Sequence, residues 1–226
     1  MRYTRDSIRA DLKNLGISWD WAGNKPDLVR SDVKARLTAA GSSGGVGSFD
    51  EIAEYCWVAY EKAVSSQGDV VIGRVPHLNA AGLYEKVGEM LKEDTNFDAK
   101  AAGNLLKMDK WAKVVNDSWV LGGIHRHGLF RLASPRAIEN LWNQNGYFIV
   151  TAREILGLLH FGYRLEQAGP WQVLSCKNQA LASAADLIKY DQLIKSGETV
   201  QQAQSLSDAE GSSARAQKQV SSFHAR

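Results

Sequence analysis

The chain has 226 residues, with 27 lysine and arginine residues against 25 acidic ones, and a formal net charge of +2. Its 44% hydrophobic and 23% charged residues are ordinary for a globular protein and exclude a disordered chain. No apolar run reaches the roughly 20 residues that span a bilayer, and two cysteines exclude a disulfide-rich scaffold or a cysteine-rich zinc site. These numbers predict one large domain, or one domain with an appendage, and leave the function open.

The N-terminal part predicts helices around a flexible joint. Thr4 can cap a helix over residues 4–15 that Gly16 ends, and a weaker helix is predicted over 27–40. The run GSSGGVGS over 41–48 is interpreted as a linker, because the alternative, a phosphate-binding loop, needs a Lys-Ser/Thr ending that is missing.

A better-defined helix follows this joint. Ser48 and Glu51 have the spacing of a capping box, and Cys56 falls on the apolar face, which favours a core residue over a nucleophile. We therefore divide the chain into a helical segment with its linker (1–47), an α/β domain (48–196) and a polar C-terminal tail (197–226).

Short apolar runs alternate with helical patterns in the middle of the chain. The best strand candidate is 69–74, which is β-branched, continuously apolar and bounded by glycine. Further strands are predicted over 129–134, 147–150 and 171–176, and helices over 80–92, 111–127, from 135 to the turn at 145–146, from 151 to 162, and over 179–194. The alternation predicts an α/β fold, with a small, mostly parallel sheet flanked by helices and helical N-terminal and C-terminal extensions.

Two histidines stand out near the end of a predicted helix. His125 and His127 would share one face of a strand, but on a helix they lie about 200° apart and cannot form one site. Cations at a helix C-terminus are favoured by the helix dipole in any case. We keep both histidines as candidate catalytic residues, with acid/base or phosphate-binding roles, and expect no metal site.

The segment from 98 to 136 is basic. It holds seven basic residues against three acidic ones, a net charge of +4, and it contains Trp111 and Trp119. Such a combination suits phosphate pairing and base stacking with a nucleotide or nucleic acid. The helical spacing of the tryptophans suits core packing equally well, so both interpretations stay open.

Polar residues follow two of the predicted strands. Arg74 comes after the first strand and Ser134 after the second, and in open α/β sheets ligands bind outside the carboxyl ends of the strands. His77 and Asn116 could reach the same edge, although a surface histidine is the plainer interpretation of His77. The candidate substrate-binding residues are Arg74, Asn116, Arg131, Ser134 and Arg153.

Glu154 is the candidate general base. It stands beside Arg153 near the start of a predicted helix and would act as a base if it faced a cleft. The plainer interpretation is a first-turn glutamate that the helix dipole favours.

Several short motifs lie over about residues 69–165. They are Val71-Ile-Gly-Arg74 with Leu78, Trp111, Asn116-Asp-Ser-Trp119, Gly128, Arg131-Leu-Ala-Ser134, Arg153-Glu154 with Leu158, and Gly162-Tyr163. Together they resemble the C-terminal toxin domains of bacterial polymorphic (Rhs-type) secreted proteins. Related domains often carry an aspartate near the second strand, where this chain has Leu132-Ala133-Ser134. The resemblance assigns no specific reaction and names no cofactor.

The resemblance implies an antibacterial effector that acts on nucleic acid, a nucleotide or NAD in a target cell and is paired with an immunity protein. Delivery would then use a secretion apparatus or a carrier domain, which fits the charged first 15 residues, where no Sec-type signal core is visible; otherwise we expect a cytoplasmic protein. The alternative is a non-catalytic binding or adaptor module of a secretion particle, a phage or an immunity system. A housekeeping nucleotide-binding domain ranks last, because no G-x-G-x-x-G follows the first strand.

Overall fold

The computed structural model describes residues 3–16, 49–65, 67–74, 77, 113–169 and 171–208. Its helices are α1 (Arg5–Asn14), α3 (Phe49–Ser65), α7 (Lys113–His125), α8 (Val150–His160), α9 (Gln179–Ala184), α10 (Leu187–Gly197) and α11 (Val200–Leu206), with a short 3-10 helix η1 (Ile138–Asn140). Its strands are β1 (Val70–Ile72), β2 (Phe130–Leu132), β3 (Tyr163–Ala168) and β4 (Trp171–Cys176). Within these ranges, no helix is long and apolar enough to cross a membrane.

The four described strands form one sheet in the order β1-β2-β4-β3. β1 and β2 are parallel, with Val71 opposite Arg131, so the chain crosses over between them through α7. β4 is antiparallel to both β2 and β3. The predicted mixed α/β class is confirmed, but "mostly parallel" is wrong in detail, because β3 and β4 form a hairpin that turns at Gly169.

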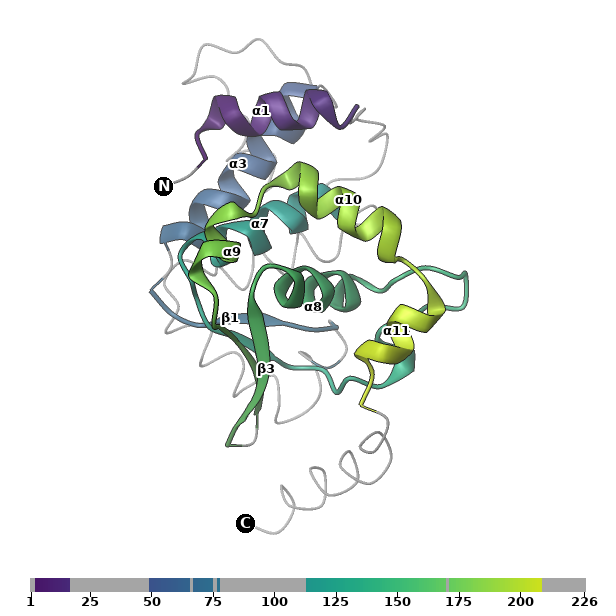
Figure 1. Ribbon diagram of the computed structural model, residues 1–226. Coiled ribbons are helices and arrows are strands. Elements are labelled where there is room, and N and C mark those ends of the chain that lie inside the picture. The colour runs from purple at the N-terminus through teal and green to yellow at the C-terminus, as the bar shows by residue number, and fades with distance from the viewer. Residues whose placement is uncertain are drawn as a thin grey trace.

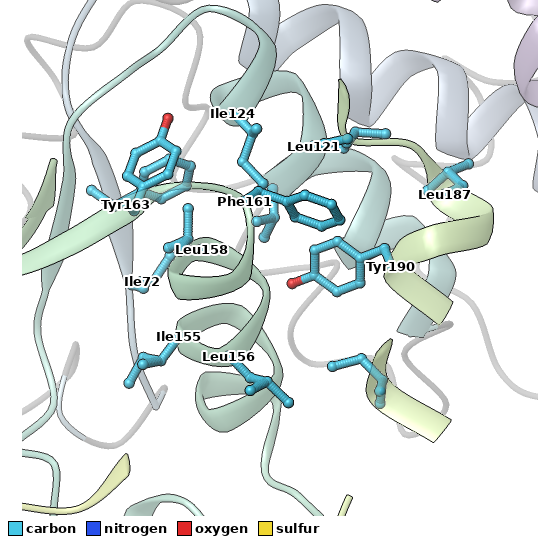
Figure 2. Close-up of a cluster of buried hydrophobic side chains, with 14 of the residues drawn as sticks. Ile72, Leu121, Ile124, Ile155, Leu156, Leu158, Phe161, Tyr163, Leu187 and Tyr190 are labelled. Carbon is cyan, nitrogen blue, oxygen red and sulfur yellow. The ribbon is translucent and has the colours of Figure 1, made fainter. Parts of the chain in front are cut away.

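Helix α8 lies in the middle of the molecule (Figure 1) and contacts α7, α10, α11 and β3. Residues 151–158 are all buried, so the middle of the helix is enclosed on every side, while its last two residues are exposed. Figure 2 shows how its apolar residues Ile155, Leu156 and Leu158 lie among side chains from the sheet and from the neighbouring helices. Full burial of each such side chain stabilises the fold by about 1.5–3 kcal/mol.

The N-terminal helix α1 packs on α3 and α10. Thr4 caps it through a hydrogen bond from the Ser7 backbone N–H, as its sequence predicts, and Ile8 and Leu12 are fully buried. Helix α3 in turn packs closely on α7, where a Cβ at Gly122 would lie only 2.5 Å from the Tyr60 carbonyl oxygen. The predicted core position of Cys56 is confirmed, and burial raises the pKa of its thiol to about 12.

Several predicted elements differ from the structure. The helix predicted from residue 135 is reduced to η1, and the strand predicted over 147–150 is a single bridge between Trp142 and Phe148. Thr151, the first residue of the helix predicted from 151, lies inside α8, whose N-cap Ile149 makes no side-chain hydrogen bond to the helix. The helix predicted over 179–194 is broken into α9 and α10, because Ala185 is extended and Asp186 caps a new helix.

The helices predicted over 27–40 and 80–92, the joint at 41–48 with Ser48, and Trp111 all lie outside the described residues. Part of the predicted polar tail is ordered as α11, where Ala203 and Leu206 are buried. Arg136 fastens this helix, since its guanidinium donates to the Leu206 carbonyl (2.8 Å) and pairs with Asp208 (3.2 Å).

Candidate functional site

The carboxyl ends of β1 and β2 bring three of the predicted polar residues together. The Arg74 backbone N–H donates to Ser134 Oγ (2.7 Å), and His77 Nδ1 lies 2.8 Å from the same oxygen. Ser134 is 2% exposed, whereas Arg74 and His77 are only half-buried. The expected meeting of Arg74 and Ser134 at this sheet edge, with His77 in reach, is confirmed.

Gly73 allows this close approach. Its φ of +147° is a conformation that L side chains rarely adopt, and a Cβ there would lie 2.8 Å from Ser134 Oγ. Glycine at the end of β1 therefore lets the backbone of Arg74 reach the Ser134 hydroxyl.

A fourth residue, Asn140 of η1, completes the group. Arg74 Nη1 donates to Asn140 Oδ1 and to the Glu139 carbonyl oxygen, both at 3.1 Å. We call Arg74, His77, Ser134 and Asn140 the edge site. Sequence reasoning missed Asn140, because only the fold brings residues 74 and 140 together.

The protonation state of His77 follows from its surroundings. Partial burial and the nearby Arg74 charge lower the pKa of His77 below its ordinary 6.5, and the Glu139 carboxylate opposes them more weakly. The imidazole is therefore neutral at pH 7 and can accept a proton. Its Nε2 makes no hydrogen bond to the part of the chain that the structure describes.

A second polar group lies deeper, where α7 meets α8. Asn116, Asp117, Arg153 and Glu154 are each no more than 5% exposed, and we call them the buried polar cluster. Arg153 Nη2 and Asp117 Oδ2 are 2.6 Å apart. Burial alone would lower the pKa of Arg153, but the Asp117 carboxylate raises it, so the guanidinium stays protonated.

The protonation state of Glu154, the fourth residue of the buried polar cluster, is set mainly by its burial. Burial raises the pKa of its carboxyl from 4.5 to about 8, against the opposing influence of the Asn116 side chain. Glu154 Oε2 and Asn116 Nδ2 find no hydrogen-bond partner within the described ranges. The group is therefore mostly protonated at pH 7. The general-base role of Glu154 stays a prediction, and the structure encloses this side chain instead of presenting it at a surface.

His125 occupies the middle of a hydrogen-bonded chain. Its Nδ1 lies 2.8 Å from the Tyr60 hydroxyl and its Nε2 lies 3.0 Å from the Ala185 carbonyl oxygen. Because that carbonyl only accepts, Nε2 carries the proton and Nδ1 accepts from Tyr60. Through these two contacts His125, at the end of α7, connects α3 to the junction between α9 and α10 and so helps to hold these elements together.

His127 ends α7 in a left-handed conformation with φ of +58°. Its N–H donates to the Ile124 carbonyl oxygen and the Gly128 N–H to the Gly123 carbonyl oxygen, the pattern of a Schellman motif. Glycine usually holds this position, and histidine is among the side chains that tolerate it. His127 thus lies beyond the end of α7, and its catalytic role stays a prediction.

Two arginines of the predicted basic segment are paired with carboxylates, and a third is bonded to a backbone carbonyl oxygen. Arg131 pairs with Asp69 (2.5 Å), Arg136 pairs with Asp208, and Arg126 donates to the Gly68 carbonyl oxygen. Lys100, Lys107 and Lys110 lie outside the described residues. Arg131 and Arg153 are thus held in ion pairs, and Arg74 is the candidate substrate-binding arginine that the edge site contains.

The described residues contain no group of three histidine, cysteine or acidic side chains that could hold a metal ion. No family model, curated protein or solved structure matches this chain. The candidate function therefore depends on the geometry of the two polar groups.

Proposed function

We propose that the protein is an enzyme that acts on a phosphate-bearing substrate, such as a nucleic acid or a nucleotide, at the edge site. The observation that carries this proposal is the juxtaposition of a neutral histidine and a half-buried arginine around Ser134, at the carboxyl ends of two parallel strands. Ligands of open α/β sheets bind at such edges.

Each residue of the edge site has a distinct role in this proposal. Arg74 holds the substrate phosphate through its guanidinium. His77 accepts a proton from the attacking water or substrate hydroxyl as that oxygen bonds to phosphorus, and the proton is then returned to the departing oxygen. Ser134 is enclosed and acts through the others as a positioning residue.

Ser134 can support the proton-accepting form of His77. A hydroxyl oxygen accepts two hydrogen bonds, so Ser134 Oγ takes one from the Arg74 N–H and one from His77 Nδ1–H. In that tautomer Nε2 carries the free lone pair. When Nε2 takes a proton, the Nδ1–H bond to Ser134 is retained, so the ring keeps its orientation.

The first test incubates the purified chain with labelled RNA and DNA oligonucleotides, nucleotides and NAD, and follows the products by chromatography. His77→Gln should lower kcat by about 100-fold or more, and Arg74→Ala should raise KM. Exposed residues supply the matched controls, His160→Gln and Arg164→Ala, which should leave both constants unchanged. Wild-type rates in His77→Gln and Arg74→Ala would overturn the proposal.

We further propose that the substrate lies in a competing bacterial cell, as the resemblance to toxin domains implies. Tightly repressed expression in bacteria should arrest growth on induction, and His77→Gln should relieve the arrest at equal levels of folded protein. Normal growth with abundant soluble wild-type protein, together with no turnover in vitro, would favour the alternative of a binding or adaptor module.

A further inference from the structure

One nitrogen of the Arg74 guanidinium is already committed within the protein. Nη1 carries two hydrogens, and it donates to two acceptors, the Glu139 carbonyl oxygen and Asn140 Oδ1, each at 3.1 Å. Both acceptors belong to η1, so this short helix fixes the plane of the guanidinium at the end of β1.

Asn140 is itself held in one orientation. It is 4% exposed, and its Nδ2 donates to the Pro135 carbonyl oxygen (3.0 Å). Because that contact requires the amide nitrogen, the amide oxygen must face Arg74. Asn140 therefore orients the arginine as well as pairing with it.

The other edge of the guanidinium remains for a ligand. Nε and Nη2 make no hydrogen bond to the residues that the structure describes, and Arg74 is half-buried. Their parallel N–H groups match two oxygens of one phosphate group, a geometry that a lysine cannot offer.

Local charge favours a singly charged phosphate. His77 is neutral at pH 7, and the Glu139 carboxylate lies close enough to influence its pKa. Arg74 supplies one positive charge, which balances the single charge of a phosphodiester. The second charge of a terminal phosphate would lose hydration beside the Glu139 carboxylate without being balanced by this guanidinium.

We propose that the Nε–Nη2 edge of Arg74, oriented by Asn140, binds one phosphodiester group of a nucleic-acid strand. The inference rests on the proposed function and narrows its substrate from phosphate compounds to nucleic-acid chains. Asn140 is a positioning residue, because it acts through Arg74.

Binding is measured with the His77→Gln protein, which retains the Nε–Nη2 edge of Arg74 but should not turn over substrate. Labelled single-stranded RNA and DNA oligonucleotides are titrated and followed by fluorescence anisotropy, and an unlabelled dinucleotide and a nucleoside monophosphate serve as competitors. The double variant that also carries Arg74→Lys should bind about 10-fold more weakly, because lysine keeps the positive charge but lacks the paired N–H groups of the Nε–Nη2 edge. Arg164→Lys is the matched control and should have no effect.

Asn140→Ala in the otherwise wild-type enzyme should raise KM about 10-fold while leaving the pH dependence of kcat unchanged, because His77 keeps its surroundings. Circular dichroism verifies that this variant folds, and Arg74→Lys keeps the proposal testable if it does not. Comparison of RNA with DNA shows which sugar the site accepts.

The outcomes separate this inference from the proposed function. Equal binding by Arg74→Lys, or stronger competition by the monophosphate than by the dinucleotide, would overturn the phosphodiester site and leave a phosphate-acting enzyme in place. Tight binding that Arg74→Lys weakens, together with no turnover by the wild-type protein, would support the phosphodiester site and contradict the enzymatic proposal. Absence of binding to both RNA and DNA would overturn the inference.

Discussion

The edge site and the buried polar cluster both contain an arginine, but the two guanidinium groups have different kinds of partner. In the buried polar cluster, Arg153 lies 2.6 Å from Asp117 and each side chain is 6% exposed. In the edge site, Arg74 is held through one nitrogen by neutral acceptors, and no carboxylate among the residues that the structure describes is bonded to it. The first arrangement uses the guanidinium within the fold, and the second leaves it able to bind an anion.

The same contrast holds for the titratable partners. Half-burial beside Arg74 lowers the pKa of His77 and keeps a proton acceptor neutral, whereas full burial raises the pKa of Glu154 and keeps a carboxyl protonated. A perturbed pKa marks both groups, but only His77 combines it with partial exposure. Depth, rather than residue type, therefore distinguishes the proposed site for chemistry from the buried polar cluster.

The largest effect is expected from breaking the buried ion pair. Asp117→Asn leaves the Arg153 charge enclosed without its carboxylate partner, which should lower the free energy of unfolding by about 3–5 kcal/mol. The matched variant Asp69→Asn breaks the Arg131 pair, whose side chains are 29% and 32% exposed, and should cost less than about 1 kcal/mol. Urea unfolding measures both, and equal losses would contradict the distinction between the two kinds of pair.

Glu154→Gln sharpens the comparison through pH. The folded protein holds the Glu154 proton up to about pH 8, while the unfolded chain releases it near 4.5, so wild-type stability falls as pH rises between these values. Glutamine resembles the protonated carboxyl and removes this dependence. The variant should match wild type at pH 4 and exceed it increasingly toward pH 8. A difference in stability that does not change with pH would show that Glu154 is not held protonated.

A smaller effect is expected at the glycine that closes the edge site. Gly73→Ala places a Cβ against Ser134 Oγ and requires a rare φ, so it should cost about 1–3 kcal/mol. It should also change the pKa of His77, measured by NMR of the ring protons. Gly146→Ala is the control, because its φ is also positive but no atom lies within 4 Å of the added Cβ. An unchanged His77 pKa in Gly73→Ala would show that Ser134 does not set the surroundings of the ring.

Much of the edge site could be predicted from sequence because its signals are local. The apolar run of β1 ends in glycine, β2 follows a helix, and parallel strands bring their carboxyl ends to one edge, which places Arg74 near Ser134. Nothing in the local sequence marks Asn140, because it belongs to the site only through its hydrogen bond with Arg74, which lies 66 residues earlier in the chain. Strand β3 was missed because most of its residues are exposed and polar.

The buried polar cluster could not be predicted for a related reason. Charged residues near the start of a helix usually face water, and nothing local indicates that α8 is enclosed on all sides. Arg153 and Asp117 lie 36 residues apart in the chain, and their pairing joins α8 to α7. Sequence therefore selected Glu154 as a candidate general base, beside the plainer interpretation of a first-turn glutamate, but could not give its depth or its protonation state.

We propose that the chemistry takes place at the edge site and not in the buried polar cluster. The most direct measurement compares nucleic-acid cleavage by His77→Gln and Glu154→Gln at equal concentrations of folded protein. We expect His77→Gln to lose cleavage and Glu154→Gln to retain it near the wild-type rate. Loss of cleavage in Glu154→Gln, with full activity in His77→Gln, would instead place the catalytic base on α8.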